Sequence, residues 1–110
     1  MEERTAVFAA DIRSFDRGVP RNIVNIEDVK QLVRSSGSVA ASCIEANEAL
    51  GEKDRVMRFR ISRKESKESQ LWLRLINLGE EAALANQRQK LRSEAHELKL
   101  ILTSIIKKLE

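Results

Sequence analysis

The stretch Gln31–Leu50, QLVRSSGSVAASCIEANEAL, decides the fold, because its serine-rich middle is typical of a loop while both of its ends are typical of a helix. Small and apolar residues run through it at alternating steps of three and four, which is the spacing of one face of a helix. The repeat continues through the serines, so the sequence predicts an unbroken helix. The row starts upstream of the stretch and consists of Ile26, Val29, Val33, Ser36, Ala40, Cys43, Asn47 and Leu50.

This predicted helix has recognisable ends and a weak centre. Asn25 is expected as its N-cap, with Asp28 completing an acidic variant of the capping box, and Gly51 is expected to supply a left-handed residue after its end. Gly37 in the interior costs roughly 1 kcal/mol relative to Ala. Packing against neighbouring helices must therefore stabilise the segment, and its small residues allow another backbone to approach closely.

A second helix with small residues follows after a short connection. Asp54 is a possible cap for it, and Gly79, after Leu78, is expected to end it. The short connection around Gly51 makes the two helices antiparallel neighbours, whose serines can then face each other. The row on this helix again alternates by three and four and consists of Phe59, Ser62, Ser66, Ser69, Leu73 and Ile76.

Two more helices complete the expected fold. The first carries Phe8, Ile12 and Phe15 and is expected to end at the break marked by Gly18 and Pro20. We therefore predict an all-α fold, an up-and-down antiparallel four-helix bundle, with residues 1–110 forming a single domain. The last helix is expected to begin between Glu80 and Gln87, and its row consists of Leu91, Ala95, Leu98, Leu102, Ile105 and Leu109.

Composition agrees with a soluble helical protein. Of the 110 residues, 34% are charged and 42% hydrophobic, which is unlike a disordered or a membrane chain. No run approaches the roughly 20 apolar residues of a membrane span, and the acidic N-terminus does not resemble a signal peptide. We therefore expect a cytoplasmic protein without a membrane partner. The single cysteine, Cys43, cannot form an internal disulfide.

The sequence offers no catalytic constellation. Glutamates lie three apart at Glu45 and Glu48, yet the di-iron bundles with such pairs also need a histidine on each of two helices. His96 is the one histidine and lies in a polar segment, and Cys43 is interpreted as a small buried residue. We therefore expect no enzyme activity, no catalytic residue, no metal site and no cofactor.

Basic residues cluster along the predicted third helix. A stripe at helical spacing can bind phosphate groups, and without interleaved aromatic residues such binding would not depend on base sequence. The alternative interpretation is a solvated face in which Glu65 and Glu68 form local ion pairs, each worth a few tenths of a kcal/mol. The candidate nucleic-acid-binding residues are Arg60, Arg63, Lys64, Lys67 and Arg74.

A second surface of the central helices indicates self-association. Leu73 and Ile76 already occupy the predicted core row, so the neighbouring Trp72 widens the apolar surface beyond what one chain needs. We expect this surface to bury against an adjacent protomer, with polar residues fixing the register. The candidate interface residues are Arg34, Glu68, Leu71, Trp72, Leu75 and Leu100.

The chain also resembles a bacterial family of four-helix bundles named after proteins encoded in intervening sequences of 23S ribosomal RNA genes. The resemblance rests on EERT near the N-terminus, on the opening stretch above, and on RFRISRKESKESQLWLRLI. Ser42 and Cys43 depart from it, because a polar residue followed by an aromatic one is more usual there. The resemblance implies a ring, commonly a pentamer, and no catalytic residues.

Two classes of function remain open. Related accessory proteins of diversity-generating retroelements use such a ring to bind a reverse transcriptase and nucleic acid, so the resemblance implies that RNA or DNA is a partner. The first class is a non-enzymatic homo-oligomeric bundle that binds nucleic acid through the basic stripe. The second is a protein–protein interaction adaptor or scaffold, whose charge serves solubility.

Overall fold

The computed structural model describes residues 1–110 and contains four α-helices and no strands, which confirms the all-α class. The helices are α1 (Glu2–Asp16), α2 (Ile23–Asn47), α3 (Glu52–Leu75) and α4 (Ala82–Leu109). The serine-rich stretch is part of one continuous helix, α2, as its spacing predicts. The molecule is elongated, with extents of 47 × 21 × 20 Å. No helix combines the length and the apolar character needed to cross a lipid bilayer.

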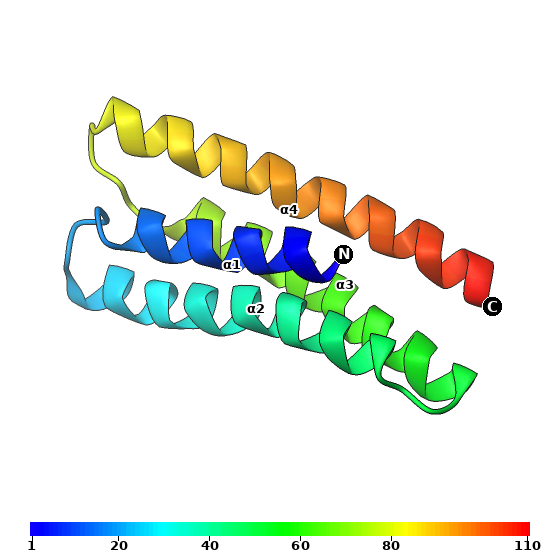
Figure 1. The fold of residues 1–110 in the computed structure, drawn as a ribbon. Helices are drawn as coiled ribbons and strands as arrows, with labels where there is room; N and C mark the ends of the chain where they lie inside the picture. The colour runs from blue at the N-terminus through cyan, green and yellow to red at the C-terminus, as the bar shows by residue number, and fades with distance from the viewer.

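The four helices differ in how much of the long axis they cover. α2 packs against α1 and α3, and α4 packs against α3 and α1. α1 is short, so the N-terminus lies about midway along α4 (Figure 1), and it lies beside the end of α2, where Asn47 Nδ2 donates to Glu2 Oε2 at 2.7 Å. The hydrophobic core is divided in the same way, into one part that α1 covers and one part that lies beyond it. All four helices contribute to the larger cluster, whereas a smaller cluster, formed by Cys43, Ala46, Val56, Phe59, Leu102 and Ile106, comes from α2, α3 and α4 alone.

Buried serines join α2 to α3. The hydroxyls of Ser35 and Ser69 lie 2.9 Å apart, and the Ser62 hydroxyl donates to the Val39 carbonyl oxygen at 2.8 Å. Cys43 Sγ lies 3.3 Å from the same Ser62 hydroxyl. Each of these polar groups has a partner, so its burial costs little. The small side chains therefore allow close contact between the two helices, as expected.

The buried face of α2 is displaced from the predicted row. Ile26, Asn47 and Leu50 are exposed, and Val29, Val33 and Ala40 are only half-buried. The reason is that α2 packs against both α1 and α3, so its buried face is wider than one row and is centred between the two neighbours. Leu50 lies beyond the end of the helix. The buried residues are Asn25, Leu32, Ser35, Ser36, Val39, Ser42, Cys43 and Ala46.

Both expected ends of α2 are wrong. The N-cap is Asn22, whose Oδ1 accepts from the Asn25 backbone N–H at 2.9 Å, so Asn25 lies inside the first turn. Gly51 has φ −126°, an extended conformation, and serves as the N-cap of α3. The chain leaves α2 already at Asn47, and Glu48 completes the end in a right-handed conformation. No left-handed residue is therefore needed there.

The remaining boundaries were predicted in part. α1 ends at Asp16, before Gly18, and α4 begins at Ala82, inside the expected interval. Asp54 lies in the first turn of α3 and is not its cap. Gly79 does adopt a left-handed φ of 68°, but it belongs to the connection beyond the end of α3. Its role is therefore to turn the chain toward α4.

Candidate nucleic-acid interface

The predicted basic stripe lies on one surface of α3. Arg60, Lys64, Lys67 and Arg74 are exposed, and Arg63 is half-buried. Steps of three and four residues bring these side chains to the same side of the helix. An apolar residue, Leu71, is exposed within the same surface, between Lys67 and Arg74.

Most of this stripe has no acidic partner. Arg60 binds Glu110 through Nη2, at 2.7 Å from Oε1. The other four candidates, Arg63, Lys64, Lys67 and Arg74, form no ion pair, because the ion pairs of the molecule involve other cations. The middle of α3 therefore presents cations whose charge no neighbouring side chain neutralises.

The bases at the start of α3 differ from those in the middle. Arg55 pairs with Glu52 at 2.6 Å. Arg58 pairs with Glu45 of α2 at 3.0 Å and with Asp54 at 3.3 Å. These cations are locally neutralised and contribute little net charge to the surface. The stripe with uncompensated charge thus begins near residue 60.

The two glutamates of RKESKES do not pair with the stripe. Arg34 of α2 forms ion pairs with both glutamates instead: its Nη1 lies 3.3 Å from Glu65 Oε2, and its Nη2 lies 3.6 Å from Glu68 Oε1. The Glu65 side chain is only 5% exposed, and the ion pair with Arg34 offsets part of the cost of burying its carboxylate. The local ion pairs of the alternative interpretation are therefore not formed within RKESKES. Arg34 and Glu68, both candidates for an interface, are partners within one chain.

The apolar interface candidates divide into exposed and packed residues. Leu71, Leu75 and Leu100 are 44%, 52% and 53% exposed, the first two on α3 and the third on α4. Trp72 is half-buried and packs against the larger core cluster, and its Nε1–H is buried without a hydrogen-bond partner. Packing within a single chain therefore accounts for most of the burial of Trp72. The three leucines remain exposed and could contact another protomer.

Basic residues of α4 were missed in the sequence. Arg92 borders α3, because its carbonyl oxygen accepts from Gln70 Nε2 at 3.4 Å. Lys99 and Lys107 follow Arg92 at seven and fifteen positions, so they lie on the same side of α4. None of the three forms an ion pair. The helical spacing of these three cations can be read from the sequence. Which side of α4 faces α3 cannot, so the sequence did not show that they lie beside the α3 stripe.

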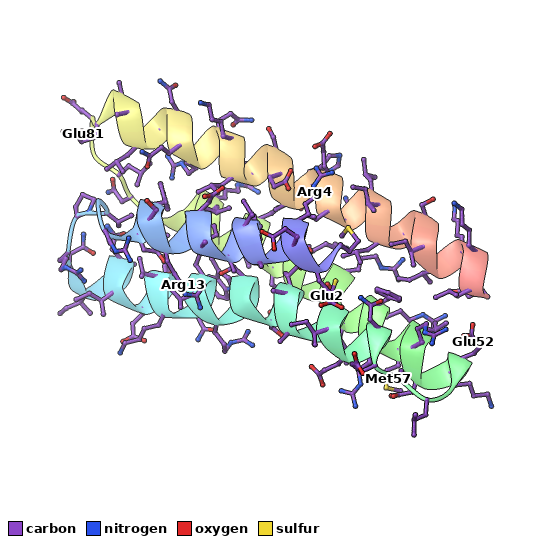
Figure 2. The ribbon with its side chains drawn as sticks, viewed as in Figure 1. Glu2, Arg4, Arg13, Glu52, Met57 and Glu81 are labelled. Carbon is purple, nitrogen blue, oxygen red and sulfur yellow. The ribbon has the colours of Figure 1, made fainter.

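Other reactive or charged groups serve the packing. Arg4 of α1 binds Glu94 of α4 through two bonds of 2.8 Å and Glu97 at 2.9 Å, and these bonds raise its pKa; Figure 2 shows Arg4 directed toward α4. Burial raises the pKa of the Cys43 thiol. No group of three or more His, Cys, Asp or Glu side chains is placed to hold a metal ion.

The chain is similar over nearly its whole length to a solved structure. That structure is of a protein of unknown function from the S23 ribosomal protein family of Bacteroides thetaiotaomicron, and it superimposes with a TM-score of 0.77. The two sequences are 26% identical, and the alignment covers 96% of this chain and 97% of that protein. No family model matches the chain, and no curated protein aligns with it. The chain is therefore similar in fold to a protein of the S23 ribosomal protein family.

Proposed function

We propose that this chain belongs to the bacterial family of 23S ribosomal RNA intervening-sequence proteins and forms an up-and-down antiparallel four-helix bundle. Support for the family comes from the resemblance in sequence and from the similarity to the S23 protein. The antiparallel arrangement of α2 and α3 is supported by two contacts between them, in which a higher residue number on α2 goes with a lower number on α3. Ser35 meets Ser69, and Cys43 meets Ser62.

The function we propose is non-enzymatic binding of RNA or DNA in the cytoplasm by a homo-oligomer, a pentameric ring in the family resembled. The observation that carries the proposal is the set of exposed cations on α3 without ion pairs. Phosphate groups would neutralise these cations and release counterions, which favours binding at low salt. A ring would present several copies of the stripe to one polymer and so raise its affinity.

A variant with three substitutions tests the stripe. Arg60→Gln, Lys64→Gln and Lys67→Gln remove charge from exposed positions, and Gln is also a good helix former, so the fold is expected to persist. Binding to nucleic acid should weaken. The slope of log affinity against log salt should fall in magnitude by about 0.9 for each phosphate of duplex DNA that is no longer bound, or about 0.7 for single strands. An unaltered affinity and slope would eliminate the stripe as the binding surface.

The second candidate function is a protein-interaction adaptor, which the exposed Leu71 and Leu75 on α3 favour. A protein partner held by apolar contacts would stay bound as salt is raised, because burial of apolar surface is not screened. Binding to generic RNA or DNA that weakens steeply with salt supports the first function. A protein partner retained through the same salt series, with no nucleic-acid binding, supports the second.

A further inference from the structure

One row of α3 lies along its boundary with α4. The row runs from residue 60 to residue 74 in alternating steps of three and four, so its members share one side of the helix. Two members touch α4. Arg60 binds Glu110, and Gln70 donates to the Arg92 carbonyl oxygen. The row therefore borders α4 along its length, and it consists of Arg60, Arg63, Lys67, Gln70 and Arg74.

A matching row of α4 lies along its boundary with α3. Arg88 Nη1 donates to the carbonyl oxygens of Leu73 and Ile76 at 3.3 and 2.5 Å, at the end of α3. The contacts of Arg92 and Glu110 fix the same side of α4 further along. Between these points the side chains follow at steps of three and four, and the row consists of Arg88, Arg92, His96, Lys99, Thr103, Lys107 and Glu110.

These two rows form the α3–α4 furrow, and its charge is almost entirely positive. Glu110 is the one acid within the rows, and Arg60 binds it. Arg88 is occupied by the carbonyl groups at the end of α3. Six cations remain without a carboxylate partner, three from each helix: Arg63, Lys67 and Arg74 of α3, and Arg92, Lys99 and Lys107 of α4.

Charges are segregated between the edges of the bundle. The α2–α3 edge holds paired charges, with Arg34 on Glu65 and Glu68. The α1–α4 edge also holds paired charges, because Arg4 forms ion pairs with Glu94 and Glu97. Glu65, Glu68 and Glu94 thus lie toward the outer edges of α3 and α4, whereas Glu97, bound by Arg4, also borders the hollow beside Gln70 and Arg92. Like charges brought together destabilise the folded chain, so this arrangement is suited to a polyanionic ligand.

We propose that the α3–α4 furrow binds the sugar-phosphate backbone of a nucleic acid, with the cations of α4 contributing as much as those of α3. This inference rests on the proposed function of nucleic-acid binding and enlarges its site from one helix to two. Three guanidinium groups, those of Arg63, Arg74 and Arg92, can each bind a phosphate through two hydrogen bonds. Contacts of this kind position a backbone without reading its bases.

The length and polarity of the furrow favour this ligand over a membrane surface. The fourteen steps from Arg60 to Arg74 span about 21 Å of helix, which is the length of about six phosphates of one strand in a duplex. Leu71 is exposed beside Lys67 and Arg74, but neither row itself contains an apolar residue within these limits, so the surface has no continuous apolar face. A helix that lies on a membrane needs an apolar face to insert beside its cations. The furrow is instead lined by groups that bind phosphate.

Two triple variants with the same change in charge test the inference. The furrow variant is Arg92→Gln, Lys99→Gln and Lys107→Gln on α4. The control is Arg21→Gln, Lys90→Gln and Lys108→Gln, which removes three exposed cations without ion pairs outside the furrow. Affinity is measured by fluorescence anisotropy between about 50 and 200 mM salt. The probes are a short DNA duplex, the RNA duplex of the same sequence, each single strand, and vesicles containing phosphatidylserine.

The furrow variant should bind nucleic acid more weakly than the control, with a salt slope smaller in magnitude by up to about 2.7 for duplex DNA or about 2.1 for a single strand. The probe that shows this change identifies the form of nucleic acid. A charge-preserving variant, Arg92→Lys with Lys99→Arg and Lys107→Arg, should retain binding, and circular dichroism should show the same helix content in each protein. If the furrow variant unfolds, Lys99→Gln alone serves in its place and should reduce the slope by about 0.7 to 0.9.

The outcomes separate this inference from the function on which it rests. Equal affinities and slopes for the furrow variant and the control, together with loss of binding when the α3 stripe is changed, would overturn the role of α4 and leave the proposed function in place. Absence of nucleic-acid binding by the unmodified protein would overturn both. Binding to the vesicles but to no nucleic acid would likewise reject a nucleic-acid ligand.

Discussion

Asn25 of α2 and Asn77 of the α3–α4 connection bind each other reciprocally. Asn25 Nδ2 donates to the Asn77 carbonyl oxygen at 2.8 Å, and the Asn77 backbone N–H donates to Asn25 Oδ1 at 3.1 Å. The same Nδ2 donates to the Pro20 carbonyl oxygen at 2.9 Å. One buried amide thus ties together the two connections at the same end of the molecule.

Replacing this amide should destabilise the fold strongly. Asn25→Ala removes three hydrogen bonds made by a side chain that is itself buried, and each such bond contributes about 0.5–1.5 kcal/mol. We expect a loss of about 1.5–4.5 kcal/mol in the free energy of unfolding, measured by urea denaturation. The control is Asn22→Ala, which removes the N-cap and should cost about 1 kcal/mol. Equal losses in the two variants would contradict the role assigned to Asn25.

The sequence predicted the existence of the helices better than their boundaries. Periodicity through Gly37 and the serines was sufficient to identify α2, because the apolar and small residues recur over many turns. Asn25 and Asn22 are both acceptable N-cap residues, and the choice between them depends on a contact with Asn77, far along the chain. Local signals carry no information about such a contact.

The candidate site was predicted in part for a related reason. The cations of α3 were visible as a stripe, and they do share one surface. Whether Arg92 and Lys99 join that surface depends on the rotation of α4 about its axis, which the contacts with Gln70 and Arg60 fix. Likewise, the alternative interpretation paired Glu65 with its sequence neighbours, but Arg34 across the α2–α3 edge binds it.

Gly37→Ala should stabilise the protein by up to about 1 kcal/mol. Gly37 lies within α2, where Ala is favoured over Gly by about that amount. An added Cβ would meet only Nη2 of Arg13, at 3.3 Å, which is the far end of a flexible side chain on α1. The change is measured as a rise in melting temperature. A lower melting temperature would show that the Arg13 side chain cannot move aside.

Asp16→Asn should change stability in a pH-dependent manner. Both carboxylate oxygens of Asp16 are buried without a partner, and this burial raises its pKa from 3.8 to about 7, against the opposing effect of Arg13. The folded protein therefore holds this proton more tightly than the unfolded chain does. The contribution of Asp16 to folding is most favourable below about pH 4 and is lost as the pH rises to about 7.

Because Asn carries no charge at any of these pH values, the variant should gain stability mainly in neutral solution. We expect its free energy of unfolding to exceed that of the unmodified protein by about 1–4 kcal/mol above pH 7 and by little near pH 4. Urea denaturation across this pH range is the measurement. A gain of the same size at both ends of the range would show that Asp16 does not titrate in the folded protein as described.

Arg34→Met should destabilise the protein by about 1–3 kcal/mol. The variant leaves the buried Glu65 carboxylate without a cation, and the effect is moderated because the Arg34 side chain is 55% exposed and partly screened by solvent. Adding Glu65→Leu should restore much of the loss. The matched control is Lys30→Met, whose partner Glu27 is exposed, and it should change stability by less than about 0.5 kcal/mol. If the double variant were no more stable than Arg34→Met, the destabilisation by Arg34→Met would not come from a buried carboxylate left without a cation.

Leu71→Gln combined with Leu75→Gln should weaken self-association. These two side chains lie one turn apart on α3 and are about half exposed in the single chain, so burying the rest against another protomer would stabilise an oligomer by about 0.7–1.5 kcal/mol for each. Losing about 2 kcal/mol in total corresponds to a dissociation constant raised by about 30-fold. Gln preserves helix propensity, so the monomer fold should persist.

Sedimentation velocity over a range of protein concentrations measures this effect. The control is Val7→Gln, which makes a comparable polar substitution at an exposed apolar residue of α1, away from the proposed interface. The control should associate like the unmodified protein, while the α3 double variant should dissociate at concentrations at which the control remains assembled. If the unmodified protein is a stable monomer at micromolar concentration, the proposed oligomer is rejected. If all three proteins associate equally, Leu71 and Leu75 are not part of the interface.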